Sequence, residues 1–421
     1  QDTLDRYSAQ IRQWGQALTN QAEILLYGCE VAAGELGRQF VQQLSHLTQA
    51  TIAASTHLIG SAKRGANWTL DYQTGSIQSS PAFSPEAMTA YEGVLEIVNF
   101  LTESFAGTSV TGDWQFGVGD PTSGTQANPF LTASPIVTPP LGGLPGIATP
   151  LDTPGAGTLR LTNATLNQAA FVLYNTPIQA DAGLRITFDM FQYGGTTSDP
   201  TIPAGADGLN FFLIDGATQA ATVPRAGAFG GSLGYAQKNT PTVVPGIAGG
   251  YLGIGFDAFG NYSRATEGRN GGVPGEGQLP DTVTVRGSEA TQYAYLTSTG
   301  TLPFSLDVPA PQGGTRANSL RRVQIDLDPT GLLSVAMDLN GNNIFTDAGE
   351  ALISNFNIRS GAAGIDNGVV PSSFKFGFAA GTGDSTNVHE IRNLTVQSFT
   401  SPPETTDSLV TLQPGATVNL T

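Results

Sequence analysis

The sequence predicts a mainly β protein that begins with a small α/β unit, and three observations support this prediction. From about residue 159 onward, apolar and polar residues alternate, as they do in strands with one face on a core. The 421 residues include 53 glycines and 26 prolines, a composition typical of turn-rich β proteins. Residues 1–85 instead have the spacing of helices that alternate with short strands.

Two amphipathic helices are predicted in residues 1–85, and strands are predicted at residues 23–27, 51–55 and 68–72. The order helix–strand–helix–strand favours a parallel α/β unit. The unit is short for a complete domain, so we expect further strands upstream of Gln1. The apolar helix faces consist of Leu4, Tyr7, Ile11, Trp14 and Leu18, and of Leu36, Phe40, Val41, Leu44 and Leu47.

Residues 24–34 and 41–44 resemble a domain of unknown function (DUF4347-like) found in large bacterial surface proteins. The resemblance implies a relation to caspase-type peptidases, in which a cysteine ends a strand and a histidine lies one strand earlier. Cys29 has the place of that cysteine, but the histidine segment would lie upstream of Gln1, and His57 follows the next strand. A thiol without a base is a poor nucleophile, so we predict a non-catalytic chain with Cys29 as a buried structural residue.

The middle and C-terminal parts of the chain differ in their patterns. Residues 86–107 have apolar positions at helical spacing and predict a helix that links the two parts. Residues 118–158 are rich in proline, glycine, threonine and serine, which predicts ordered surface loop. Period-two alternation predicts antiparallel strands at residues 184–190, 323–327, 333–337 and 374–378.

Three loop tips adjoin apolar, strand-like runs in residues 206–261. Asp207 precedes residues 209–214, an apolar run broken only by one asparagine, as expected for a strand covered on both faces. Gly230 and Gly231 form the second tip, where the backbone can approach a ligand closely. Asn261 follows the third run. A carboxylate, a backbone N–H and an amide that converge on one point suit a polyol with adjacent hydroxyls.

Residues 108–400 resemble the L-type (legume-lectin-like) lectins, specifically their bacterial branch. The resemblance implies a jelly-roll β-sandwich with a carbohydrate site. It is carried by residues 108–114, 171–175, the three loop tips, and residues 266–272, 374–378 and 389–394. The implied sugar-binding residues are Asp207, Gly230 or Gly231, Asn261, and Gly383 and Asp384 of a fourth loop, with Phe229, Tyr235 or Tyr262 as stacking aromatics.

The same resemblance implies a calcium ion that supports this site. Gly255 and Ala265 stand where two of the expected carboxylates would be, and Glu267 could replace one of them. Because a hard cation needs about six oxygen ligands, the sequence leaves calcium open at this position. The matching ligands are Asp257, the carbonyl of Phe259 and Asn261.

A second calcium candidate is the segment at residues 338–350. Its oxygen-bearing positions alternate as in calcium loops of the EF-hand or dockerin kind, although the closing acid falls one residue late. The alternative is a β-hairpin, in which the asparagines and glycine serve only the turn. The ligands of this candidate would be Asp338, Asn340, Asn342, Ile344, Asp347 and Glu350.

Composition argues against several classes of function. The chain has 34 acidic and 18 basic residues, a net charge of −16, which disfavours binding to nucleic acid. One cysteine excludes an internal disulfide, and with three histidines a structural zinc site is unexpected. No run reaches the roughly 20 apolar residues of a membrane span.

These observations predict a non-catalytic carbohydrate-binding module, part of a larger bacterial adhesin or matrix protein that lies outside the cell or on its surface. Its partners would be glycans or polysaccharide, bound weakly at each site and strengthened by avidity. The alternative is a structural subunit of a self-assembling filament. It is suggested by residues 401–421, a linker and a strand-like piece that could be donated to an open sheet edge of a neighbouring copy.

Overall fold

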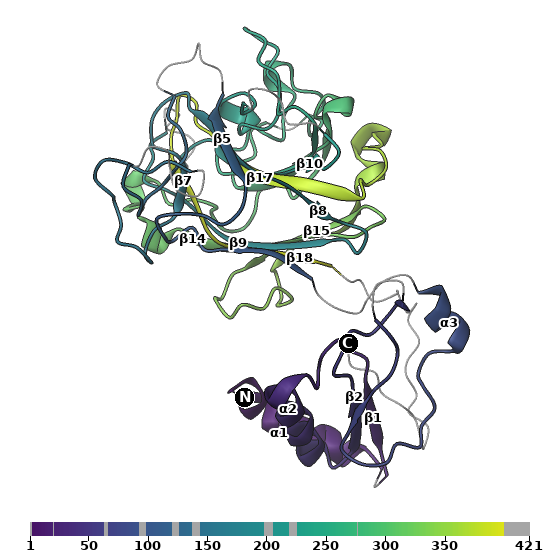
Figure 1. Cartoon of the computed structure of the whole chain (residues 1–421). Coiled ribbons are helices and arrows are strands. Elements are labelled where there is room, and N and C mark those ends of the chain that lie inside the picture. The colour runs from purple at the N-terminus through teal and green to yellow at the C-terminus, as the bar shows by residue number, and fades with distance from the viewer. Residues whose placement is uncertain are drawn as a thin grey trace. The chain divides into compact units, whose positions relative to one another are not determined.

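A computed structural model of the chain describes residues 2–19, 21–62, 66–91, 98–119, 126–136, 144–197, 205–218, 225–275 and 277–399. The chain divides into two compact units, residues 1–98 and residues 99–399, which are described separately (Figure 1). Within the described residues, no helix has both the length and the apolar character needed to cross a lipid bilayer. The linker and strand predicted at residues 401–421 lie outside the described residues.

The N-terminal unit is α/β, as predicted. Strand β1 pairs with β2 in parallel and β3 pairs with β2 antiparallel. Val41, Leu44 and Leu47 of the predicted apolar face are buried in one cluster with Ile24 and Ile52, whereas Leu36 and Phe40, predicted for the same face, are exposed. The elements are α1 (Asp2–Ala17), β1 (Glu23–Leu26), α2 (Gly34–Thr48), β2 (Thr51–Ala54), β3 (Tyr72–Gln73) and α3 (Pro85–Ala90).

The helix predicted over residues 86–107 is wrong in its C-terminal part, where residues 99–103 form a strand. Helix α3 ends at Ala90, and strand β4 (Asn99–Glu103) pairs with β18 (Val388–Ser398), a strand almost 300 positions later in the chain. Leu101, Glu103 and Phe105 are buried and alternate with their neighbours, which is the pattern of a strand. The apolar residues therefore serve a long-range pairing that their local helical spacing does not reveal.

Residues 99–399 form two antiparallel sheets that stack face to face, which confirms the predicted mainly β sandwich (Figure 1). In the described residues, one sheet has the order β13-β12-β11-β10-β17-β8-β5, and the other has the order β16-β15-β14-β9-β18-β7-β6 with β4 paired to β18. The first sheet contains β5 (Trp114–Val118), β8 (Ala169–Gln179), β10 (Gly208–Asp215), β11 (Gly250–Asp257), β12 (Thr282–Arg286), β13 (Tyr295–Ser298) and β17 (Ser373–Gly381). The second contains β6 (Phe130–Leu131), β7 (Leu159–Thr162), β9 (Leu184–Tyr193), β14 (Leu320–Leu327), β15 (Leu332–Asp338), β16 (Ala351–Asn357) and β18 (Val388–Ser398).

Aromatic side chains join the two sheets. Phe188 of β9 packs against Phe378 of β17 with ring centroids 4.9 Å apart, and Phe378 packs against Phe211 of β10 at 5.4 Å. On the opposite face of β9, Arg185 donates to both carboxylate oxygens of Asp326 at 2.8 Å. The alternation of the sequence thus separates core residues from polar ones, as predicted.

Strand β10 is covered on both faces, which the apolar run at residues 209–214 predicts. Leu209, Phe211 and Leu213 lie in the core between the sheets. Phe212 and Ile214 face a second apolar cluster that includes Tyr235 and Tyr262, contributed by the loops over this sheet. The outer face of this sheet is therefore a platform on which long loops are packed.

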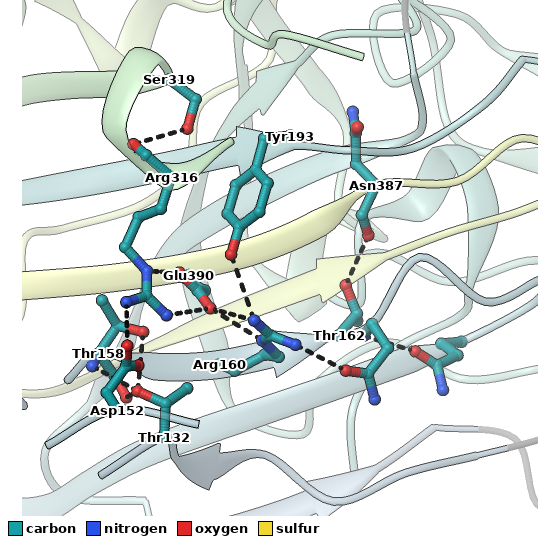
Figure 2. Close-up of polar contacts among 12 residues, drawn as sticks. Thr132, Asp152, Thr158, Arg160, Thr162, Tyr193, Arg316, Ser319, Asn387 and Glu390 are labelled. Carbon is teal, nitrogen blue, oxygen red and sulfur yellow. Dashed lines mark hydrogen bonds and ion pairs between the residues drawn. The ribbon is translucent and has the colours of Figure 1, made fainter. Parts of the chain in front are cut away.

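A buried ionic network joins strands of the second sheet to Asp152 and Arg316, which lie outside its strands (Figure 2). The carboxylate of Glu390 in β18 is fully buried and pairs with Arg160 of β7 at 2.8 Å and with Arg316. Arg316 also pairs with Asp152 at 2.9 Å, and Arg160 donates to the hydroxyl of Tyr193 at 3.2 Å. Buried ion pairs of this kind hold their geometry because each charge has several hydrogen-bonding partners.

Candidate functional site

The predicted loops meet at one end of the first sheet. In the β10 ladder, Gly208 lies opposite Asp257 of β11 and opposite Gly381 of β17. Because both pairings are antiparallel, the residues before β10, after β11 and after β17 all leave the sheet at the same end of these strands. The short helix η3 (Gly230–Ser232) joins them, since the Gly230 N–H donates to the Thr382 carbonyl at 3.0 Å.

These loops enclose a pocket of about 470 Å³. Asp207, Gly230, Gly231, Asn261, Gly383 and Asp384, the six residues predicted for sugar binding, all line it. Of the aromatic candidates, Phe229 lines the pocket, whereas Tyr235 and Tyr262 are fully buried in the platform beneath. Lys238 contacts the face of Phe229, with its Nζ 4.3 Å from the ring centroid.

Asp207 and Asn261 form the polar floor of the pocket. The Asn261 amide Nδ2 donates to Asp207 Oδ1 at 3.1 Å. Within the described structure, the other two oxygens, Asp207 Oδ2 and Asn261 Oδ1, are buried and accept no hydrogen bond. Burial raises the pKa of Asp207 well above its usual range, and the nearby carboxylate of Asp257 raises it further. The peptide bond between Ala206 and Asp207 is cis.

The fourth loop forms one rim of the pocket. Gly383 donates to the Ser385 carbonyl at 3.1 Å and accepts from the Asn167 N–H at 3.1 Å, so its backbone is fixed on both sides. Asp384 is exposed at this rim. An ideal Cβ on Gly383 would lie 3.1 Å from Asp207 Oδ2, so the loop approaches the carboxylate closely.

Of the residues predicted as the first calcium site, Asp257 and Phe259 have oxygens that already accept from protein donors, whereas Asn261 Oδ1 accepts none within the described structure. Asp257 accepts the N–H of Gly260 at 2.7 Å and of Tyr262 at 2.6 Å, and the Phe259 carbonyl accepts from Gln278 at 2.7 Å. Burial raises the pKa of Asp257 to about 7.

Glu267 is likewise committed to protein partners. Its carboxylate pairs with Lys238 at 2.7 Å and with Arg269 at 2.9 Å. Burial acts to raise the pKa of Glu267, but the hydrogen bond from Lys238 and the charge of Arg269 bring that pKa below its ordinary value. Within the described ranges, no three His, Cys, Asp or Glu side chains are grouped so that they could hold a metal ion.

The second calcium candidate lies between β15 and β16 as a hydrogen-bonded loop. Asp347 Oδ2 accepts from the side-chain amides of Asn340 at 2.8 Å and Asn342 at 2.7 Å. Asp338 accepts the backbone N–H groups of Gly341 and Asn343, and Glu350 accepts those of Leu339 and Asp347. The Ile344 N–H donates to Asn342 Oδ1. The predicted ligands thus lie close together. Their contacts are the hydrogen bonds of a β-hairpin turn, which was the alternative to a calcium loop.

In the N-terminal unit, Cys29 and His57 have structural partners. Cys29 is half-buried rather than buried as predicted, and its Sγ accepts the Ile59 N–H at 3.1 Å. The His57 ring lies 3.0 Å from the Ser55 hydroxyl and 3.7 Å from the Asp71 carboxylate. These contacts give no support to the relation with caspase-type peptidases that the resemblance implies.

Two arginines near the pocket were not predicted. Arg269 and Arg286 are buried. Arg286 donates to backbone carbonyls, and Arg269 donates to the Asn261 carbonyl and to the side chains of Ser232, Thr266 and Glu267. The partners of Arg286 are carbonyl oxygens, which carry no side-chain signal. The only sequence signal available is the position of Arg286 at the end of an alternating run, where a polar residue marks the face opposite the core.

Comparisons with known proteins include a family match for the N-terminal stretch. Residues 1–95 match the family described as "Domain of unknown function (DUF4347)", which confirms that prediction for the N-terminal stretch. No curated protein matches the chain in sequence.

Solved lectin structures show similarity at low sequence identity. The exoplasmic/lumenal domain of VIP36 in its Ca2+/Man-bound form is 14% identical, with 73% of this chain and 91% of that chain covered and a TM-score of 0.38. A Lotus tetragonolobus seed lectin is 14% identical, with coverages of 72% and 100% and a TM-score of 0.40. Peanut lectin with a nine-residue peptide is 18% identical, with coverages of 72% and 96% and a TM-score of 0.38.

Proposed function

We propose that residues 99–399 bind carbohydrate without catalysing a reaction, and that the pocket floored by Asp207 and Asn261 is the binding site. The observation that carries this proposal is the pair of buried acceptors, Asp207 Oδ2 and Asn261 Oδ1, that lack a donor within the described structure. A buried polar atom without a partner costs roughly 1–3 kcal/mol, so a ligand that donates to both gains that energy. Adjacent sugar hydroxyls have the required pair of donors.

The glycine loops supply the approach to these two oxygens. An ideal Cβ on Gly231 would lie 2.4 Å from Asn261 Oδ1, and the corresponding distance from Gly383 to Asp207 Oδ2 is 3.1 Å. Side chains at these positions would therefore block the acceptors. Since the Gly230 N–H is used by the Thr382 carbonyl, we assign the backbone donor for the sugar to Gly231. Phe229 is the aromatic residue that we expect to contact the sugar ring.

The experiment is a glycan-array screen of the full 421-residue chain, followed by titration of the best glycan into wild type and an Asp207→Asn variant. The substitution keeps Oδ1 for Asn261 but replaces Oδ2 with an NH₂ group that cannot accept a hydroxyl proton. We expect affinity to fall by at least about tenfold, because the new NH₂ group leaves a sugar hydroxyl without its acceptor in a buried site.

The matched control is Asp366→Asn, an exposed carboxylate that pairs with Arg359 in the same unit and does not line the pocket. It should bind the glycan as wild type does. A folded wild type that binds nothing on the array would contradict the proposal.

We further propose that the module belongs to a larger bacterial surface or matrix protein and works outside the cell, where several weak sites can act together through avidity. For calcium, we propose the loop at residues 338–350 rather than the pocket. Its three carboxylates are not grouped as a metal site in the described structure, so binding requires Asn340 and Asn342 to turn their side-chain oxygens toward the ion in place of the N–H groups that donate to Asp347.

Self-assembly into a filament is a second candidate function. Within the described residues, β16 pairs only with β15 and so has an open edge, as a donated strand would require. The proposed donor, residues 401–421, lies outside the described residues. Deletion of residues 401–421 should leave the chain monomeric in light scattering where the full chain forms polymers. Polymers that persist after the deletion would refute strand donation.

A further inference from the structure

We propose that the loop carrying Asn261 is held in its binding shape by the guanidinium groups of Arg269 and Arg286, and that glycan binding at this pocket is therefore independent of divalent cations. The inference rests on the proposed function, since it concerns the same pocket. In this proposal, two buried arginines stabilise the loop that calcium would otherwise stabilise.

Arg269 joins two of the pocket loops. Its guanidinium group donates to the Asn261 carbonyl at 3.0 Å and to the Ser232 hydroxyl at 3.2 Å, and Ser232 follows directly after Gly231. It also donates to Thr266 at 2.6 Å and to the Glu267 carboxylate at 2.9 Å. One rigid, planar group thus fixes the Asn261 loop against the glycine loop.

Arg286 closes the base of the same loop. It is fully buried, and the Tyr262 ring lies 5.3 Å from its guanidinium carbon. It donates, at 2.8 to 3.1 Å, to the backbone carbonyls of Tyr262, Arg264, Asn270, Gly271 and Tyr293. Burial lowers the pKa of Arg286 to about 9, so the group stays charged at neutral pH. A buried charge with this many carbonyl partners resembles a bound cation in its effect on the backbone.

The structure does not offer the oxygen shell that calcium needs in this place. Gly255 stands at one of the expected carboxylate positions, and an ideal Cβ there would lie 2.5 Å from the Tyr262 ring, so the ring fills that space. Asp257, the Phe259 carbonyl and Glu267 already accept from protein donors. The oxygens that remain are too few for a shell of about six.

The two arginines also compensate the buried acids. The positive charge of Arg269 acts to lower the pKa of both Asp207 and Asp257, against the larger effect of their burial. A divalent ion would have to enter beside these cations, and like charges in a buried site repel strongly. The arginines therefore stabilise the loop in the way that a calcium ion would, and their positive charges also disfavour binding of that ion.

The test compares wild type with Arg269→Gln and Arg269→Lys in the full chain, with Arg359→Gln as the matched control at an exposed site. Hydrogen exchange is followed in the peptide that spans residues 259–272, with EDTA and with added calcium. We expect wild-type exchange to be the same in both conditions. Arg269→Gln should exchange at least about tenfold faster in this peptide, with Arg269→Lys in between because it keeps the charge but not the fork of donors.

Glycan titrations on the same proteins separate this inference from the proposed function. We expect wild type to bind equally in EDTA and in calcium, and calcium should not restore binding to Arg269→Gln. Calcium protection of residues 259–272 in wild type, or unchanged exchange in Arg269→Gln, would overturn the inference even if glycan binding is confirmed. A wild type that binds no glycan refutes the proposed function, while the exchange data still decide the part played by the arginines.

Discussion

At the scale of single residues, Asp257 makes the stability of the folded state depend on pH. Its folded-state pKa of about 7 lies above the ordinary value of 3.8, mainly because of burial. Above pH 4 the unfolded chain ionises this carboxyl while the folded chain keeps it protonated. The folded state is therefore increasingly disfavoured as pH rises from about 4 to about 7, by about 4 kcal/mol in all, and no further above that range.

We expect Asp257→Asn to lose this dependence. The amide oxygen can still accept one of the two backbone N–H bonds, but the side chain no longer titrates. Urea unfolding at several pH values should show that the stability of wild type relative to the variant falls between pH 4 and pH 7. A constant difference across this range would show that Asp257 is ionised in the folded state.

At the scale of elements, we predict that the loop between β15 and β16 binds calcium. Binding would exchange the amide donors on Asp347 for the ion and would order the residues around Asp338 and Glu350. Calcium at about 100 times its dissociation constant should then raise the free energy of unfolding by about 2.7 kcal/mol.

Asp338→Asn is the variant that tests this loop, and Asp257→Asn is its control beneath the pocket. We expect calcium to stabilise wild type and Asp257→Asn equally, and to leave Asp338→Asn unchanged in thermal unfolding. Stabilisation that survives Asp338→Asn but not Asp257→Asn would move the ion to the pocket, against the inference drawn from Arg269 and Arg286.

At the scale of the whole molecule, the sequence predicts what depends on local periodicity. The strands β9, β14, β15 and β17 follow from alternation, and both faces of β10 are covered as its apolar run indicates. Strand β4 could not be predicted, because its pairing with β18 joins residues far apart in the chain.

In the pocket, too, the sequence predicted the loops but not the contacts between residues far apart in the chain. Three of the loops were predicted from their own residues and the fourth from the resemblance to lectins, and the antiparallel register of β10 explains why the loops that adjoin β10, β11 and β17 meet. Arg286 could not be foreseen, because its partners are backbone carbonyls spread over residues 262–293. Tyr262 was predicted as a stacking residue, but Gly255 leaves space beneath the loop and the ring packs there instead.

The most direct test of the proposed function is the affinity of the full chain for its best array glycan, measured in EDTA for wild type and Asp207→Asn. Our account predicts that wild type binds without calcium and that the variant loses at least about tenfold in affinity, with Asp366→Asn unchanged. Equal binding by wild type and Asp207→Asn would contradict the assignment of this pocket as the carbohydrate site.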